Sequence, residues 1–195
     1  AGIVLGNNIG GGNKGRNKVI GAVAGAAIGG AVGYNMDNQA KEVAQSLNTN
    51  VNNNPTAALD PNQDLIVSNT DNYVKIMFRD DMMFETNSEN PTYAAGTKIA
   101  KITTVLQKYP NTLVQVVGHT DSRGTHAYNL ALSEKRATNV GNIINSTGVQ
   151  NQIFSKGCSF DKPIALNNSD ANMGLNRRVE VYLYPNQQSV IDVCR

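Results

Sequence analysis

The sequence predicts an α+β fold, a sandwich in which two helices cover one face of a small mixed sheet. From residue 65 onward, short β-rich runs alternate with two long segments of helical periodicity. The length of 195 residues leaves room for one ordinary domain plus appendages. Only 16% of the residues are charged, and the abundant Asn and Gly suit loops and turns. One folded domain with polar flanking segments is therefore expected.

The N-terminal third has a different composition from the rest. Its centre is VIGAVAGAAIGGAVG (residues 19–33), an uncharged segment with a glycine at every fourth position: Gly21, Gly25, Gly29 and Gly33. This spacing places the glycines near one helical face, where another helix can approach closely. The segment is shorter than the roughly 20 residues that span a bilayer. It is expected to insert shallowly, to associate with copies of itself or to pair with AGIVLG, and the alternative is a flexible Gly/Ala linker.

An apolar helical stripe follows the glycines. Met36, Ala40, Val43 and Leu47 recur at helical spacing, which predicts that the helix continues to this point. Residues 48–64 are rich in Asn, Pro and Asp and predict a linker. The expected organisation is a membrane-associated helical segment over 1–47, the linker, a domain over 65–185 and a tail over 186–195.

The predicted order of elements in the domain is β-α-β-α-β-(loop)-β. The strands are predicted at YVKIMF, LVQVVG, IFSKG and VEVYLY. The first helix lies in 92–109 and is ended by Pro110, and the second lies in 126–148, with Gly148 as its stop signal. A further short helix is expected around Asp170–Leu175.

Charge and cysteine content exclude several classes of site. The net charge is +2 and no Lys/Arg stripe is visible, so nucleic-acid binding is not expected. His119 and His126 lack metal-ligand spacing with Cys158 and Cys194, so neither a metal nor another cofactor is expected. The two cysteines are free thiols in a reducing compartment, or they clamp the C-terminal tail in an oxidising one.

The stretch GHTDSRGTHAYNLALSEKRA (residues 118–137) carries the candidate binding chemistry. It leaves a strand end, turns at Ser122–Gly124 and enters a helix, a place where backbone N–H groups favour anions. Asp121 lies in the turn and Arg136 lies about three turns into the helix. If the turn folds back, a carboxylate and a guanidinium face one cleft, which is the pair that a zwitterionic amino-acid head group needs.

Two other interpretations of this stretch remain. His119, Asp121 and the nearby serines resemble the parts of a hydrolase, but Ser122 and Ser133 lie outside a G-x-S-x-G elbow, so catalysis is not expected. His119 is then a strand-end histidine packed under a loop. A structural salt bridge between Asp121 and Arg136 is the alternative to a ligand site.

These residues resemble a known family. GHTDSRG followed by Asn129, Leu132, Ser133, Arg136 and Ala137 is similar to the signature of the OmpA-like C-terminal domain family, and FETNS, KPI and NRRVEV resemble its flanking segments. The resemblance covers roughly residues 65–185. It implies a periplasmic domain that binds peptidoglycan non-covalently through the diaminopimelate of its stem peptide. The family's two defining contacts map onto Asp121 and Arg136, and Thr120, Leu132 and Phe84 map onto positions that line the cleft.

A second resemblance concerns the N-terminal segment. VIGAVAGAAIGGAVGYNMDNQAKEV is similar to the glycine zipper of outer-membrane lipoproteins that carry an OmpA-like domain. This implies the periplasmic face of the outer membrane, where a Cys158–Cys194 disulfide is expected. Ala1 is not a plausible start for a secreted precursor, so a processed chain is expected, and a lipid-bearing cysteine ahead of it fits a lipoprotein.

The resulting hypothesis is a binding protein that tethers the outer membrane to the cell wall. The alternative is a structural subunit of a trans-envelope secretion or motor complex that docks on the wall with the same domain. The glycine segment then self-associates or contacts other subunits of the complex. A wall hydrolase is the third possibility, and it requires His119 for activity.

Overall fold

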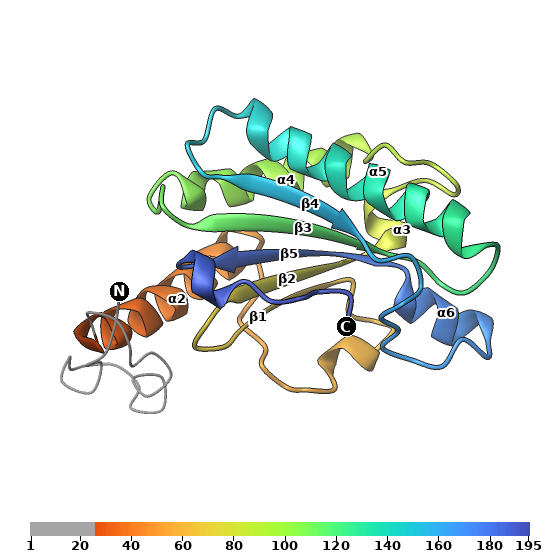
Figure 1. Cartoon of the computed structure of the whole chain (residues 1–195), viewed down its shortest axis with the longest axis horizontal. Coiled ribbons are helices and arrows are strands. Elements are labelled where there is room, and N and C mark those ends of the chain that lie inside the picture. Colours follow the sequence, from red (N-terminus) through yellow and green to blue (C-terminus); the bar gives the residue numbers. More distant parts are fainter. Residues whose placement is uncertain (1–25) are drawn as a thin grey trace.

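A computed structural model gives the fold of residues 26–195, with side chains described from residue 35 onward (Figure 1). The glycines at 21 and 25, and the region around AGIVLG, lie outside the described residues. The helices are α2 (Ala26–Ser46), α3 (Asp80–Met83), α4 (Tyr93–Leu106), α5 (His126–Ser146) and α6 (Asp170–Asn176), with 3-10 turns η2 (Ala57–Leu59) and η3 (Gln187–Ser189). The strands are β1 (Leu65–Asn69), β2 (Val74–Arg79), β3 (Leu113–His119), β4 (Ile153–Gly157) and β5 (Arg178–Tyr184).

The five strands form one mixed sheet in the order β1-β2-β5-β3-β4. Only β3 and β4 run parallel, joined by α5 as a crossover helix, and the other neighbours are antiparallel. The predicted strands and helices, including the short helix α6, are confirmed. Strand β1 was not predicted from the sequence; it forms a hairpin with β2 through the turn after Asn69.

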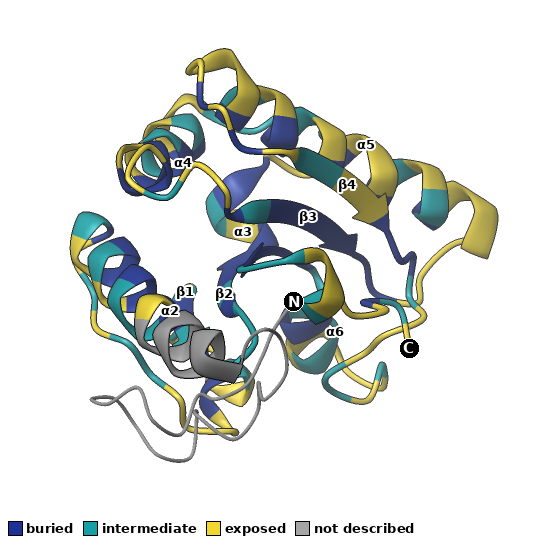
Figure 2. Cartoon of the chain, turned by 60° about the vertical axis from the view of Figure 1, so that its left-hand side comes forward, coloured by how far each residue is buried: buried dark blue, intermediate teal, exposed yellow. Residues whose placement is uncertain are grey.

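Helices α2, α4 and α5 pack on one face of the sheet (Figure 2). Their inward side chains meet the buried strand residues in one apolar core, which includes Ile99, Ile102, Phe78 and Val181, each 0% exposed. Thr92 and Thr125 begin α4 and α5 by accepting backbone N–H bonds from Ala95 and Tyr128, at 3.2 and 3.1 Å. The predicted layer of two helices is therefore present, with a third helix beside it.

The third helix changes the expected domain boundary. The predicted stripe of α2 is buried in the domain core: Met36 and Val43 are 0% exposed, Ala40 is 1% and Leu47 is 6%. Glu42 accepts hydrogen bonds from Tyr109 and Lys108, at 2.6 and 3.1 Å. The second half of α2 is thus part of the folded unit, because an apolar stripe that meets a sheet is stabilised by burial.

The segment expected as a linker is also held by the domain. Val51 makes a parallel bridge with Val67 of β1, and the Asn52 N–H donates to the Val67 carbonyl at 2.8 Å. The Asn53 side-chain amide donates to Asn69 Oδ1 at 3.0 Å, and its Oδ1 accepts the backbone N–H of Asn69 at 2.8 Å. Residues 51–54 therefore cover the free edge of β1, and the packed unit begins well before residue 65.

The other face of the sheet is covered by the C-terminal tail. Val193 packs against Tyr182 and Tyr184 in a second, smaller core. Cys158 and Cys194 form a disulfide with an S–S distance of 2.09 Å, which ties the tail to the end of β4. The expected disulfide is confirmed, and it fixes the segment that shields this side of β5.

Candidate binding cleft

The GHTDSRG turn is held close to α5 by the packing of β3 against that helix. A Cβ atom added at Gly118 would lie 2.4 Å from the backbone oxygen of Ser133, so no larger residue fits there. Gly124 has φ +88°, a left-handed conformation that favours glycine. Both glycines of the motif therefore serve to bring the turn that carries Asp121 back toward the helix that carries Arg136.

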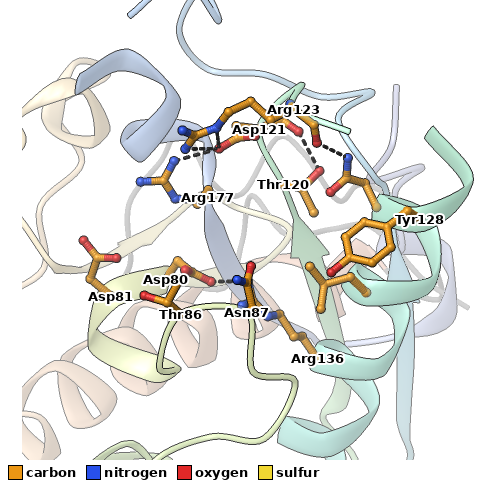
Figure 3. Close-up of a pocket in the computed structure, with 12 residues that line it drawn as sticks. Asp80, Asp81, Thr86, Asn87, Thr120, Asp121, Arg123, Tyr128, Arg136 and Arg177 are labelled. Atoms are coloured by element: carbon orange, nitrogen blue, oxygen red, sulfur yellow. Dashed lines mark hydrogen bonds and ion pairs between the residues drawn. The ribbon is translucent and has the colours of Figure 1, made fainter. Parts of the chain in front are cut away.

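A cleft of about 340 Å³ opens between this turn, α3, α5 and the residue before β5 (Figure 3). Of the five predicted ligand residues, Thr120, Asp121, Leu132 and Arg136 line it. Phe84 is not among the residues that line the cleft, and its ring centroid lies 4.5 Å from the guanidinium carbon of Arg136. The expectation that Phe84 forms a wall of the cleft is corrected: its ring contacts Arg136 through a cation–π interaction.

Asp121 and Arg136 form ion pairs with other residues on separate sides of the cleft (Figure 3). The Oδ2 atom of Asp121 accepts hydrogen bonds from Arg123 Nη2 at 3.0 Å and from Arg177 Nη1 at 2.7 Å. Its Oδ1 atom accepts the backbone N–H of Arg123 at 2.9 Å. Asp121 and Arg136 are therefore paired with other residues and not with each other in a structural salt bridge.

Arg136 is fixed from two directions. Its Nη1 donates to Asp80 Oδ1, and its Nε donates to the Ser88 carbonyl at 2.9 Å. The second amino group, Nη2, donates no hydrogen bond within the described part of the chain. A fixed guanidinium with one unused donor is preorganised to receive a carboxylate.

Burial sets the electrostatics of the two pairs. It raises the pKa of Asp121, but the hydrogen bonds from Arg123 and Arg177 outweigh it, so the net pKa is lowered and the group stays ionised. For Asp80, burial dominates over Arg136 and Arg177 and raises the pKa. Burial also lowers the pKa of Arg136, with Asp80 acting against it. The charged groups of Asp80, Asp121 and Arg136 are thus poorly solvated, and electrostatic interactions with them are stronger than in water.

His119 and the serines do not form a catalytic arrangement. His119 is 3% exposed, and its Nε2 lies 3.1 Å from Glu180 Oε1 on the sheet. The Ser133 hydroxyl donates to the Leu130 carbonyl at 3.0 Å and accepts the Ser159 N–H at 3.0 Å. The interpretation of His119 as a buried strand-end histidine is confirmed.

The family follows from the match to this region. A family model described as the OmpA family matches residues 83–177, the segment that builds the turn, α5 and α6. Residues 83–177 are thus similar to the OmpA family. The resemblance predicted from GHTDSRG and NRRVEV is confirmed, and the α+β class with it.

Two curated relatives of known name are similar to part of this chain. The "Probable lipoprotein YiaD" of Escherichia coli is 36% identical over 103 residues, 52% of this chain and 47% of that protein. The "Peptidoglycan-associated lipoprotein" of Buchnera aphidicola is 35% identical over 96 residues, 49% of this chain and 54% of that protein. The chain thus spans about half the length of these curated relatives.

The fold of part of this chain also matches solved structures. One is titled "The structure of the cell wall anchor of the T6SS from Pseudomonas aeruginosa", with a TM-score of 0.57 and 27% identity over 64% of this chain and 90% of that chain.

Several residues of the cleft were not found from the sequence. Asp80, Asp81, Arg123, Tyr128 and Arg177 also line it. The signals for two of them were visible, since Arg123 stands inside the GHTDSRG motif and Arg177 inside NRRVEV. Asp80 lies 41 residues before Asp121, and only the sheet order, which puts β2 and β5 side by side, brings it to the site.

Within residues 26–195, no helix has both the length and the apolar character needed to cross a bilayer. The same part of the chain holds no group of three or more His, Cys, Asp or Glu side chains placed to bind a metal ion.

Proposed function

We propose that this protein binds peptidoglycan non-covalently and tethers the outer membrane to the cell wall from its periplasmic face. The match of residues 83–177 to the OmpA family model supports it, as do a relative named peptidoglycan-associated lipoprotein and a similar structure described as a cell wall anchor. The protein holds its ligand and is not an enzyme. A lipid anchor ahead of the glycine segment and the segment itself attach the chain to the membrane.

The observation that carries the proposal is the placement of Asp121 and Arg136 on separate sides of one cleft. The free end of diaminopimelate bears an ammonium and a carboxylate on one carbon. Asp121 accepts the ammonium, because its Oδ1 atom takes only one hydrogen bond from the chain. Arg136 receives the carboxylate through its unused Nη2. Thr120 and Leu132 line the space between the two groups.

The neighbouring charges make this site selective for a zwitterion. Asp80 holds the guanidinium of Arg136 in place, while Arg123 and Arg177 keep Asp121 ionised. Lysine has the same ammonium as diaminopimelate but lacks the adjacent carboxylate. The site should therefore bind walls with diaminopimelate more tightly than walls with lysine. A lysine side chain brings no carboxylate to the buried guanidinium of Arg136, so this residue would contribute nothing to binding.

Co-sedimentation of the full chain with diaminopimelate-containing sacculi tests the proposal. Asp121→Asn and Arg136→Lys keep size or charge and remove a charge-assisted bond, so each should weaken binding about 10- to 150-fold, for a loss of about 1.5–3 kcal/mol. Lys135→Ala, next to Arg136 in the sequence, is the matched control and should pellet like wild type. Equal binding to lysine-type sacculi, or normal pelleting of both site variants, would refute the binding of diaminopimelate by Asp121 and Arg136.

A second candidate is a subunit of a trans-envelope secretion complex that docks on the wall with the same domain. The similarity to the T6SS cell wall anchor favours it. In this case the glycine face of α2 contacts a partner helix. Size-exclusion and crosslinking of the full chain should then show an assembly that Gly29→Leu together with Gly33→Leu dissolves, whereas a simple tether stays monomeric in both forms.

A further inference from the structure

A second hollow, separate from the cleft, lies on the sheet face opposite the helices, at the edge formed by β1 and β2. We call it the amide-lined hollow; it has a volume of about 210 Å³ and is bounded by residues 52–58, β1 and the start of β2. This is smaller than the roughly 300–1,000 Å³ of pockets for drug-sized ligands. It suits a single ring with short substituents.

The floor of the amide-lined hollow is apolar. Ala57, Ile66 and Met77 are 8%, 6% and 2% exposed and form a small cluster of their own, apart from the two larger cores. A satellite cluster of this size can receive a methyl group, for which burial contributes about 0.8 kcal/mol. The floor therefore favours a ligand with a small apolar substituent.

The rim is made of amides, hydroxyls and one aromatic ring. Asn52 and Asn54 use their side-chain oxygens as acceptors for the N–H groups of Asn54 and Thr56, both at 3.0 Å. Their NH₂ groups donate no hydrogen bond within the described residues, so they are available to a carbonyl or hydroxyl. Tyr73 stands beside them, with its ring held edge-on at 5.2 Å from that of Tyr182.

The charge of the amide-lined hollow differs from that of the cleft. Lys75 is the charged side chain among its lining residues, and no carboxylate lines it. Amide donors, hydroxyls and an apolar floor, with Lys75 paired to Glu180 at 3.5 Å, together match a neutral polar ring with an acetamido group. They do not match a cation or the zwitterion proposed for the cleft.

From this arrangement we propose that the amide-lined hollow binds an N-acetylated sugar. The proposal rests on the proposed function, since peptidoglycan joins such a sugar to its stem peptide. Met77 of β2 lies in the hollow, and Asp80, the first residue of α3, lies in the cleft. One wall unit carries both a sugar and a stem peptide, and therefore offers a ligand to each site.

The test uses the full chain and two sugars without peptide: a β-1,4-linked trimer of N-acetylglucosamine and the same trimer of glucose. Saturation-transfer NMR should give its strongest signal at the acetamido methyl, at least tenfold above the glucose trimer. Ser68→Phe fills the hollow from β1 and should abolish the signal, with thermal unfolding as the check on its fold. Should this variant not fold, Asn54→Ala, with the exposed Asn62→Ala as its control, should reduce the signal at least threefold.

Asp121→Asn separates this inference from the proposed function. Sugar binding should remain unchanged in this variant while binding to sacculi falls. The inference is overturned if both trimers give the same signal, if no signal develops, if the filled or amide-deleted hollow still binds, or if Asp121→Asn removes sugar binding, which would place the sugar in the cleft. Failure of wild type to pellet with sacculi, beside normal sugar binding, would instead count against the proposed function.

Discussion

Replacement of Met36 by alanine is the sharpest test of where the folded unit begins. Met36 is 0% exposed and packs in the main core, although it lies 29 residues before the first strand. Truncation of a buried methionine to alanine costs about 2–5 kcal/mol, because it removes apolar contacts and leaves a cavity. For a unit of this size, about 2–4 °C is lost per kcal/mol, so the melting temperature should fall by about 4–20 °C.

Chemical and thermal unfolding of the full chain, followed by circular dichroism, measures this effect. Gln45→Ala is the matched control, because Gln45 lies on the exposed side of the same helix and its change should stay within about 0.5 kcal/mol. If α2 were an independent segment joined by a free linker, both variants would unfold like wild type. A loss below about 0.5 kcal/mol for Met36→Ala would therefore refute the packing of α2 on the domain.

Three further outcomes are expected. Gly118→Ala should destabilise the domain by more than about 2 kcal/mol in urea titrations, because its Cβ would meet the Ser133 backbone at 2.4 Å, while an unchanged midpoint would contradict that approach. Burial lowers the pKa of His119 below the unfolded value near 6.5, and the hydrogen bond that the ring makes to the Glu180 carboxylate acts against this shift. Neutral His119 therefore contributes fully to stability above its unfolded-state pKa, and this contribution is lost as the pH falls below it. The free energy of unfolding should drop between pH 7 and 5, and it should drop less steeply in His119→Gln. Loss of the disulfide in Cys158→Ser/Cys194→Ser should cost roughly 3–4 kcal/mol for a separation of 36 residues, and an unchanged melting temperature would show that the tail is held without it.

The packing of α2 ties the glycine-containing helix to the folded domain. The helix enters the core at Met36, and α3, which lines the cleft with Asp80 and Asp81, lies toward the opposite end of the domain (Figure 1). The glycine spacing at Gly29 and Gly33 is therefore continuous with a helix anchored in the domain. Residues 51–53 do not form a free linker, because they are held against β1 by backbone and side-chain contacts.

The sequence by itself determined the local elements and the two central side chains of the cleft. The turn at Ser122–Gly124 and the helical periodicity after it are encoded within a few residues of each other, so the motif could be placed on a strand end, a turn and a helix. The chemistry of Asp121 and Arg136 followed from residue type and spacing. The apolar stripe of α2 was also visible, because helical periodicity is a local property.

Only the tertiary structure decided what those elements contact. The stripe of α2 could face a membrane, another helix or a sheet, and nothing local distinguishes these partners. Strand order, which depends on long-range pairing, brought Asp80 and Arg177 to the cleft, whereas Phe84 contacts Arg136 without lining the cleft. The amide-lined hollow has the same origin: Asn54 and Met77 are far apart in sequence, and their meeting depends on how the chain before β1 folds back along the sheet edge.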